Sequence, residues 1–198
     1  MVSRARDIVL VRHPETSANV EGRYVGRGDA SLTPRGIEQI PLLVAAIQTF
    51  DPEAIHTSPL ARTRTVADTA AALLGVPEVV DDRLTELDFG LAEGLTFEET
   101  RSRGITFEFK SEDRPVAPEG ESRLDIMRRT AEVLDEIVAG ERARVAIVTH
   151  GGVFRSALVH LLGLPLSAIW AFDIRNGCTA EVRVREGHGQ LIRFENVG

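Results

Sequence analysis

Short apolar runs alternate along this chain with segments whose apolar residues recur at helical spacing. Residues 7–12 and 144–150 contain the runs "IVLV" and "VAIV", and each run ends abruptly in polar residues. Continuous β-favouring runs of this length are typical of strands that are buried on both faces of a sheet. Weaker strand patterns follow at 53–59 and 77–84, and residues 179–196 are predicted to form a hairpin that turns at Gly187 to Gly189.

Between these strands, four segments have the spacing and the boundary residues of helices. The helix expected at 34–50 has Thr33 as its N-cap and Pro34 at its first position. Gly75 is expected to stop the alanine-rich helix at 60–74. The other helices are predicted at 124–138 and 151–163, a polar loop is expected from residue 17 to the first helix, and residues 96–120 are expected to be irregular.

Strands that alternate with helices predict an α/β fold, a three-layer α/β/α sandwich with a mostly parallel central sheet. The length of 198 residues fits a single domain that covers 1–198. Within it, the polar segment at approximately 97–122 is expected to form a small lid. In sheets of this kind, ligands bind beyond the carboxyl ends of the strands, so functional residues are expected there.

The charge and composition argue against several classes of function. A net charge of -7 argues against nucleic acid as a partner, and no apolar run reaches the length of a membrane span. The only lysine, Lys110, lies in no Schiff-base or phosphate-loop setting, and the only cysteine is Cys178. We therefore expect a cytoplasmic enzyme or binding protein. No histidine spacing matches a metal site. His56 is interpreted as a structural residue of a short strand, His160 as a residue at the edge of the core, and His188 as part of the hairpin turn.

Polar residues that suit a phosphate follow three of the predicted strands. Arg12 and His13 end the first strand, and Arg62 falls in the first turn of the helix after the second. His150 and Gly151 join the last parallel strand to a helix. Arginine offers phosphate a planar fork of donors, and a helix N-terminus offers free N–H groups. Each residue alone could be a solvated or hydrogen-bonded edge residue, but their joint placement predicts one anion pocket.

Four stretches in order, "LVRHPETSAN", "SPLARTRTVADTA", "LTELDFGLAEG" and "VTHGGVFR", resemble the histidine phosphatase superfamily, which has the phosphoglycerate-mutase-like fold. The resemblance covers nearly the whole chain. It implies that His13 is a nucleophile that becomes phosphorylated and that Glu86 is the proton donor. It also implies a set of groups that hold the phosphoryl oxygens, which are Arg12, Arg62, His150 and the side-chain N–H of Asn19, beside the helix N-terminus at Gly151.

The resemblance implies a phosphomonoesterase that acts through a phosphohistidine on a small phosphorylated metabolite, without a metal or other cofactor. Arg23 and Arg27, together with the lid, are expected to contact the leaving group. Mutase-type phosphoryl transfer is the alternative, although the short lid favours hydrolysis because a mutase must keep water from the phosphohistidine. A phospho-ligand binding protein with weakened turnover is a further alternative. A homodimer is compatible with the sequence.

Pro14 departs from the family pattern, which has glycine at this position. Proline locks φ near roughly -65° and removes one N–H group. If the motif is active, this position must have a negative φ and must not need its N–H. Because proline biases the preceding residue toward extended geometry, we expect Pro14 to stiffen the mounting of His13 and to leave the chemistry intact.

Overall fold

The computed structural model describes residues 5–197, so residues 1–4 and 198 of the predicted domain lie outside the described part. A six-stranded sheet runs through its centre, in the order β3-β2-β4-β1-β5-β6. The strands are β1 (Arg6–Arg12), β2 (Ala54–Thr57), β3 (Glu78–Val80), β4 (Arg144–Thr149), β5 (Cys178–Arg185) and β6 (His188–Asn196).

Parallel pairing dominates the part of the sheet that carries the predicted site. The strands β3, β2, β4 and β1 are parallel neighbours, with Arg12 opposite Thr149 at the carboxyl ends of β1 and β4. On the other side, β5 pairs antiparallel with β1, and β6 pairs antiparallel with β5. The mostly parallel α/β sheet predicted from the sequence is therefore confirmed, and the hairpin forms its antiparallel edge.

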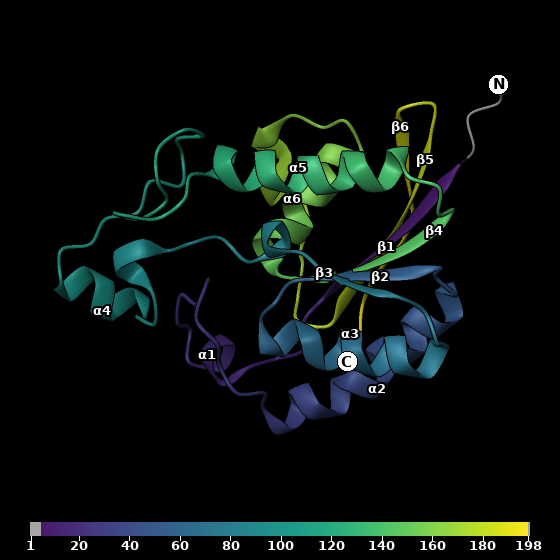
Figure 1. Cartoon of the computed structure of the whole chain (residues 1–198). Coiled ribbons are helices and arrows are strands. Elements are labelled where there is room, and N and C mark those ends of the chain that lie inside the picture. The colour runs from purple at the N-terminus through teal and green to yellow at the C-terminus, as the bar shows by residue number, and fades with distance from the viewer. Residues whose placement is uncertain (1–4, 198) are drawn as a thin grey trace.

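Helices cover both faces of the sheet, which gives the three layers that Figure 1 shows. The helices α2 (Pro34–Phe50) and α3 (Ala61–Leu74) lie on one face, and α5 (Arg123–Ala139) and α6 (Gly151–Leu161) lie on the other. Alternate residues of β1 therefore enter different cores: Ile8 and Leu10 pack with α5 and α6, whereas Val9 and Val11 pack with α2 and α3. A strand with both faces buried needs a continuous apolar run.

Local capping explains where the long helices begin and end. The hydroxyl of Thr33 accepts a hydrogen bond from the N–H of Gly36, with Pro34 at the first helical position, as predicted for α2. Ser122 and Asp125 form a capping box at the start of α5. Gly75 ends α3 with φ of 66°, in the left-handed region that glycine adopts without strain.

The structure corrects three details of the sequence prediction. A short helix, α1 (Ser17–Val20), lies in the segment predicted as a loop, and α4 (Phe97–Ser102) lies in the segment predicted as irregular. Both are capped locally, by Thr16 and Thr96. The hairpin turns one position earlier than predicted, at Glu186-Gly187, because both residues have positive φ and Gly189 already pairs within β6.

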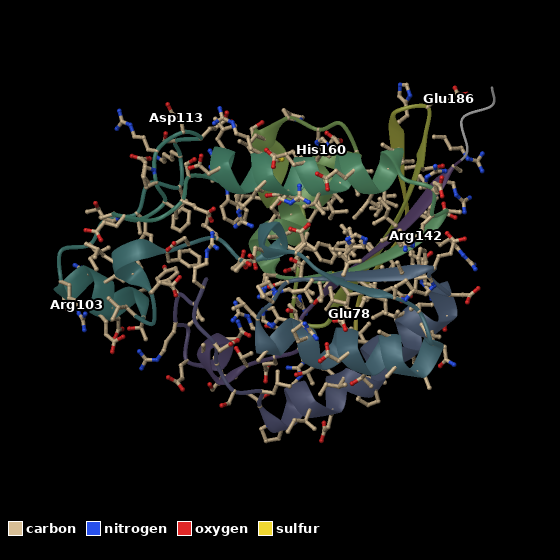
Figure 2. All side chains as sticks on the ribbon, in the orientation of Figure 1. Glu78, Arg103, Asp113, Arg142, His160 and Glu186 are labelled. Atoms are coloured by element: carbon tan, nitrogen blue, oxygen red, sulfur yellow. The ribbon has the colours of Figure 1, made fainter. Side chains whose placement is uncertain are left out.

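The carboxyl ends of the parallel strands face the side of the molecule on which α1 and α4 lie (Figure 1). Residues 97–122 leave the sheet there as α4 and a long loop. Arg103 and Asp113, labelled in Figure 2, lie at the outer edges of this segment. No helix within residues 5–197 has both the length and the apolar character needed to cross a bilayer.

Candidate active site

His13 lies directly after β1 and is held by main-chain hydrogen bonds on both sides. Its N–H donates to the carbonyl of Thr149 at 2.9 Å, and its own carbonyl accepts from the N–H of Gly177 at 3.2 Å. The ring is buried, with only 4% of the residue exposed, and its Nδ1 lies 2.7 Å from the carbonyl oxygen of Pro14. A carbonyl oxygen can only accept, so Nδ1 carries the proton and Nε2 keeps a free lone pair.

The surroundings of His13 favour its neutral form. Burial lowers the pKa of this imidazole well below its usual value of 6.5, and the positive charges of Arg12 and Arg62 lower it further. The neutral ring is the nucleophilic form, since a protonated imidazole has no lone pair. The position at the end of β1 therefore supplies an oriented nucleophile at neutral pH.

Arg12 reaches from the end of β1 to the start of α6. Its Nη1 donates to the carbonyl of Ile174 at 2.8 Å, while its buried Nε has no acceptor among residues 5–197. A Cβ added to Gly151 would lie 3.4 Å from the guanidinium carbon of Arg12 and 3.3 Å from Nη1 of Arg155. Gly151 thus lets two cations approach the N-terminus of α6, where an anion would bind.

Arg62 is almost fully buried at the start of α3 and is held by the loop that follows α1. Its Nη1 and Nη2 donate to the carbonyls of Gly28 and Gly26 at 2.6 and 2.8 Å. Its Nε donates to Nδ1 of His150 at 3.2 Å, so Nε2 of His150 carries the proton and donates to the hydroxyl of Ser58 at 2.8 Å. Both ring nitrogens of His150 are therefore engaged within the protein.

His150 is fully buried, and its ring centroid lies 5.2 Å from that of His13. Burial lowers the pKa of His150 well below 6.5, and the positive charge that His13 would carry if protonated lowers it further. The two imidazoles share one water-poor cluster with Arg12 and Arg62. These four side chains meet at the carboxyl ends of neighbouring strands, where the sequence predicted an anion pocket.

Glu86 lies opposite the N-terminus of α6, in the segment that follows β3. Both of its carboxylate oxygens accept from the N–H of Gly152 at 3.0 Å. Arg129 donates to the carbonyls of Arg83, Thr85 and Glu86, which anchors this segment to α5. A Cβ on Gly152 would come within 2.4 Å of a Glu86 carboxylate oxygen, so glycine is needed there for the close approach.

The remaining predicted residues lie nearer the surface. The side-chain oxygen of Asn19 accepts from the N–H and hydroxyl of Thr16 and from the amide of Asn176, and the side-chain N–H groups of Asn19 have no acceptor among residues 5–197. Arg23 pairs with Glu21 and Glu99 at 2.6 and 2.8 Å, and Arg27 pairs with Glu121 at 3.2 Å. These two arginines connect the first loop to the segment at 97–122.

A cavity of about 250 Å³ opens beside this cluster. Arg12, Glu86 and Gly151 line it, and so do Arg123 and Arg155. Most of the remaining wall is apolar and aromatic and includes Tyr24, Phe89, Phe109, Val116, Ile126 and Trp170. The cavity therefore places an apolar and aromatic wall next to Arg12 and Gly151, as a phosphomonoester with an apolar alcohol part would require.

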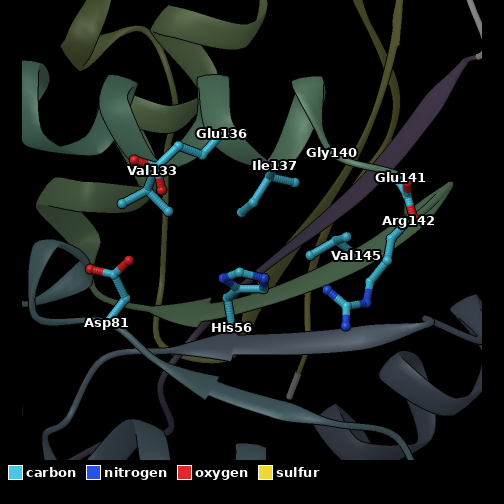
Figure 3. Close-up of a pocket in the computed structure, with 9 residues that line it drawn as sticks. All are labelled: His56, Asp81, Val133, Glu136, Ile137, Gly140, Glu141, Arg142 and Val145. Carbon is cyan, nitrogen blue, oxygen red and sulfur yellow. The ribbon is translucent and has the colours of Figure 1, made fainter.

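His56 lies in a separate, smaller cavity of about 120 Å³ between β2 and α5. Figure 3 shows its ring below Val133 and Ile137, with Asp81 and Arg142 on either side. Burial lowers the pKa of His56. Within the described chain, no group of three or more histidine, cysteine or acidic residues could hold a metal ion.

A family model of the histidine phosphatase superfamily, branch 1, matches residues 8–197, which is almost the whole chain. The chain belongs to the histidine phosphatase superfamily. The match includes all four sequence stretches on which the resemblance rested, and the fold described above is that of solved phosphatase structures.

Named relatives of this superfamily member include both phosphatases and a mutase. A putative phosphoserine phosphatase 2 from Hydrogenobacter thermophilus is 29% identical over 96% of this chain and 94% of its own. A probable phosphoglycerate mutase from Yersinia pestis is 34% identical over 90% of this chain and 85% of its own. The solved structure of a mycobacterial glucosyl-3-phosphoglycerate phosphatase with VO3 covers 98% of this chain and 100% of its own, at 26% identity and a TM-score of 0.82.

Sequence reasoning missed the residues that shape the upper part of the cavity. Arg155 was within a quoted motif but was given no role, although it follows Gly151 by one helical turn and so shares its face of α6. Tyr24, Phe109 and Trp170 come from three distant segments. Nothing in their local sequence indicates that they meet, because only the folded lid brings them together.

The two buried histidines should make this histidine phosphatase less stable in mild acid. Their folded-state pKa values lie below 6.5, so below that pH the unfolded chain binds protons that the folded chain excludes. The contribution of each histidine to the free energy of unfolding is fully present above about pH 7.5 and falls as the pH drops, by at most about 1.4 kcal/mol between pH 7.5 and 5.5. Urea unfolding at both pH values should show a smaller loss for His13→Gln and an unchanged loss for His188→Gln, whose ring is exposed.

Proposed function

We propose that this protein hydrolyses small phosphomonoesters through a phosphohistidine formed on His13. The observation that carries the proposal is the state of His13: its Nδ1 donates to the carbonyl of Pro14, so Nε2 is free for attack beside two buried arginines. The family match and the phosphatase-named relatives support a phosphomonoesterase.

In the first step, the Nε2 lone pair of His13 bonds to phosphorus while the bond to the ester oxygen breaks. That oxygen keeps the bonding electrons and takes a proton from Glu86. In the second step, the Glu86 carboxylate takes a proton from water, whose oxygen bonds to phosphorus as the phosphorus–nitrogen bond breaks. Inorganic phosphate leaves, and His13 recovers its lone pair.

The cationic cluster would stabilise the charge that spreads over the phosphoryl oxygens. Arg12 contributes its free Nε, and the remaining N–H bonds of Arg62 and the main-chain N–H of Gly151 add further donors. Asn19 contributes its amide N–H. His150 holds Arg62 through Nδ1, and it donates to a phosphoryl oxygen when that oxygen replaces the hydroxyl of Ser58.

We assign residues 97–122 as a lid within a single domain. The ion pairs of Arg23 with Glu99 and of Arg27 with Glu121 support this role, because they fasten the lid to the loop after β1. Substrate contact by Arg23 and Arg27 stays a prediction. A homodimer and a cytoplasmic location also stay predictions.

Phosphate release from p-nitrophenyl phosphate in the presence of EDTA tests the proposed function. Release that continues in EDTA supports the histidine mechanism. No phosphate release, with or without EDTA, contradicts both that mechanism and the proposed hydrolase.

The mutase-named relative makes phosphoglycerate mutase-type transfer the second candidate. Exchange of phosphate between positions of phosphoglycerate, without net release, would favour the mutase. Phosphate binding without release or exchange would favour a phospho-ligand binding protein.

Replacing Pro14 with glycine should change activity only modestly, by less than about tenfold in kcat/KM. The carbonyl of residue 14 holds His13 Nδ1, and glycine provides the same carbonyl with a less restricted backbone. We expect a small loss from the weaker orientation of the ring. Steady-state hydrolysis of p-nitrophenyl phosphate checks this, and a gain of several orders of magnitude would show that Pro14 disables the site.

A further inference from the structure

The apolar compartment above the phosphate site is built from aromatic rings that touch one another. The ring centroid of Tyr24 lies 5.3 Å from that of Phe89 and 4.5 Å from that of Phe107. The ring of Phe107 stacks on that of Phe109, with 5.3 Å between the centroids. Trp170 meets Phe109 edge-on at 6.0 Å. Aromatic rings attract one another at centroid separations of about 4.5–7 Å in stacked or edge-to-face geometry, so this wall offers favourable contacts to the ring of a ligand.

Trp170 is the exposed end of this aromatic series. Although tryptophan is usually largely buried, 56% of this residue is exposed at the rim of the cavity. Its neighbours in the cavity wall include Val116 and Ile126, which are buried and apolar. An aromatic leaving group entering the cavity would cover the ring that the protein itself leaves uncovered.

Arg155 places a positive charge in the same compartment, where Glu86 and Asp173 attract it but no carboxylate within residues 5–197 forms an ion pair with it. Its guanidinium lies over the ring of Trp170, 5.4 Å from the centroid, and Nη1 donates to the carbonyl of Gly151 at 3.2 Å. Its buried Nε has no acceptor in the stretch from residue 5 to residue 197, nor does any carboxylate there form an ion pair with it. A buried donor without an acceptor costs free energy that a ligand can recover.

The charges that line the cavity favour a ligand that carries a second anionic group besides its phosphate. Arg12, Arg123 and Arg155 are opposed by a single carboxylate, that of Glu86, although the whole chain carries a net charge of -7. Arg12 faces the phosphoryl site, and Arg123 donates to the carbonyls of Lys110 and Ser111 in the lid. Arg155 is thus the cation left for a second acidic group.

We infer that the substrate is the phosphomonoester of an aromatic alcohol that carries a carboxylate, with its ring against Trp170 and Phe109 and its carboxylate on Arg155. This inference rests on the proposed phosphatase function and names the substrate class for that site. The acidic group lies near the phosphate, because Arg12 and Arg155 both approach Gly151. Arg155 and Trp170 are specificity residues for the leaving group.

Three phosphate esters of primary alcohols test the inference while keeping the leaving-group chemistry alike: ethyl phosphate, benzyl phosphate and 3-carboxybenzyl phosphate. We expect kcat/KM to rise about tenfold from ethyl to benzyl, as the ring is buried, and about tenfold again with the carboxylate. Equal values for ethyl and benzyl, or for benzyl and carboxybenzyl, would overturn the inference.

Substitutions at two residues, Arg155 and Trp170, connect the substrate preferences to the cavity wall. Arg155→Met should lower kcat/KM for carboxybenzyl phosphate about tenfold more than for benzyl phosphate, and Arg155→Lys should restore part of the difference. Trp170→Ala should reduce the preference for benzyl over ethyl. Arg185→Met, which removes an exposed arginine in the β5–β6 hairpin, is the matched control and should leave all three values unchanged.

The variants also separate this inference from the underlying function. If Arg155→Met lowers all three values equally, Arg155 belongs to the phosphoryl clamp and the inference is wrong. If the wild-type protein hydrolyses p-nitrophenyl phosphate but shows no preference among the three esters, only the substrate class fails. If it hydrolyses none of the four esters, the proposed function fails and the inference fails with it.

Discussion

Replacing His13 with alanine should lower kcat/KM for p-nitrophenyl phosphate by about 10⁴-fold or more, since loss of a covalent nucleophile removes the first chemical step. The ring occupies a buried position with Nδ1 committed to the carbonyl of Pro14, so water that fills the space left by the side chain would not be oriented as Nε2 is. Steady-state phosphate release measures the effect.

A labelled phosphoenzyme provides the second readout for this variant. Wild-type protein quenched in alkali during turnover should carry phosphate that is released by acid, as expected of phosphohistidine, and His13→Ala should carry none. His188→Ala removes an exposed histidine of the hairpin and should keep both activity and label. Label that persists in His13→Ala would assign the nucleophile to another residue.

Replacing Glu86 with glutamine should lower turnover of an alkyl phosphate about 10²- to 10³-fold, the usual effect of losing a general acid. Glutamine keeps one side-chain oxygen for the N–H of Gly152, so the segment after β3 should keep its position. What it loses is the proton for the leaving oxygen and the base for water.

The dependence on leaving group distinguishes this role from a structural one. A nitrophenolate leaves with little help from an acid, so Glu86→Gln should slow the first step on p-nitrophenyl phosphate much less than on ethyl phosphate. Glu38→Gln, on the exposed surface of α2, is the matched control and should be silent on both substrates. An equal loss on both substrates would mean that Glu86 supports the site without donating a proton.

The architecture could be predicted because the central strands are buried on both faces. Burial of that kind requires unbroken apolar runs such as Ile8–Val11. The helix boundaries could be predicted because Thr33 and Pro34 are typical of a helix start and Gly75 is typical of a helix end. The short helices α1 and α4 were missed because, at four and six residues, they are too short for a repeating apolar pattern. In α4 the spacing of Thr96 and Glu99 was a capping-box signal that could have indicated it.

Some features of the site could also be predicted from the local sequence, whereas others depend on contacts between segments that are distant in the chain. Strand ends could be predicted to bring Arg12, His13 and His150 together, since parallel strands align their carboxyl ends. The engagement of both His150 nitrogens could not, because Arg62 and Ser58 come from a different strand–helix unit. Tyr24 and Trp170 likewise line one cavity through their contacts with Phe107 and Phe109 of the lid, which are distant from both in the sequence.

The pairing of β1 with strands from the second half of the sequence, which positions His13, also has a consequence for synthesis of the chain. β1 pairs with β4 and β5, whose first residues are Arg144 and Cys178, and the carbonyl of His13 accepts from Gly177. Contacts this distant in sequence close slowly. The chain must therefore emerge from the ribosome as far as β5 before β1 has both neighbours, so translation products truncated before Cys178 should lack an assembled nucleophile and should be clients of chaperones and proteases.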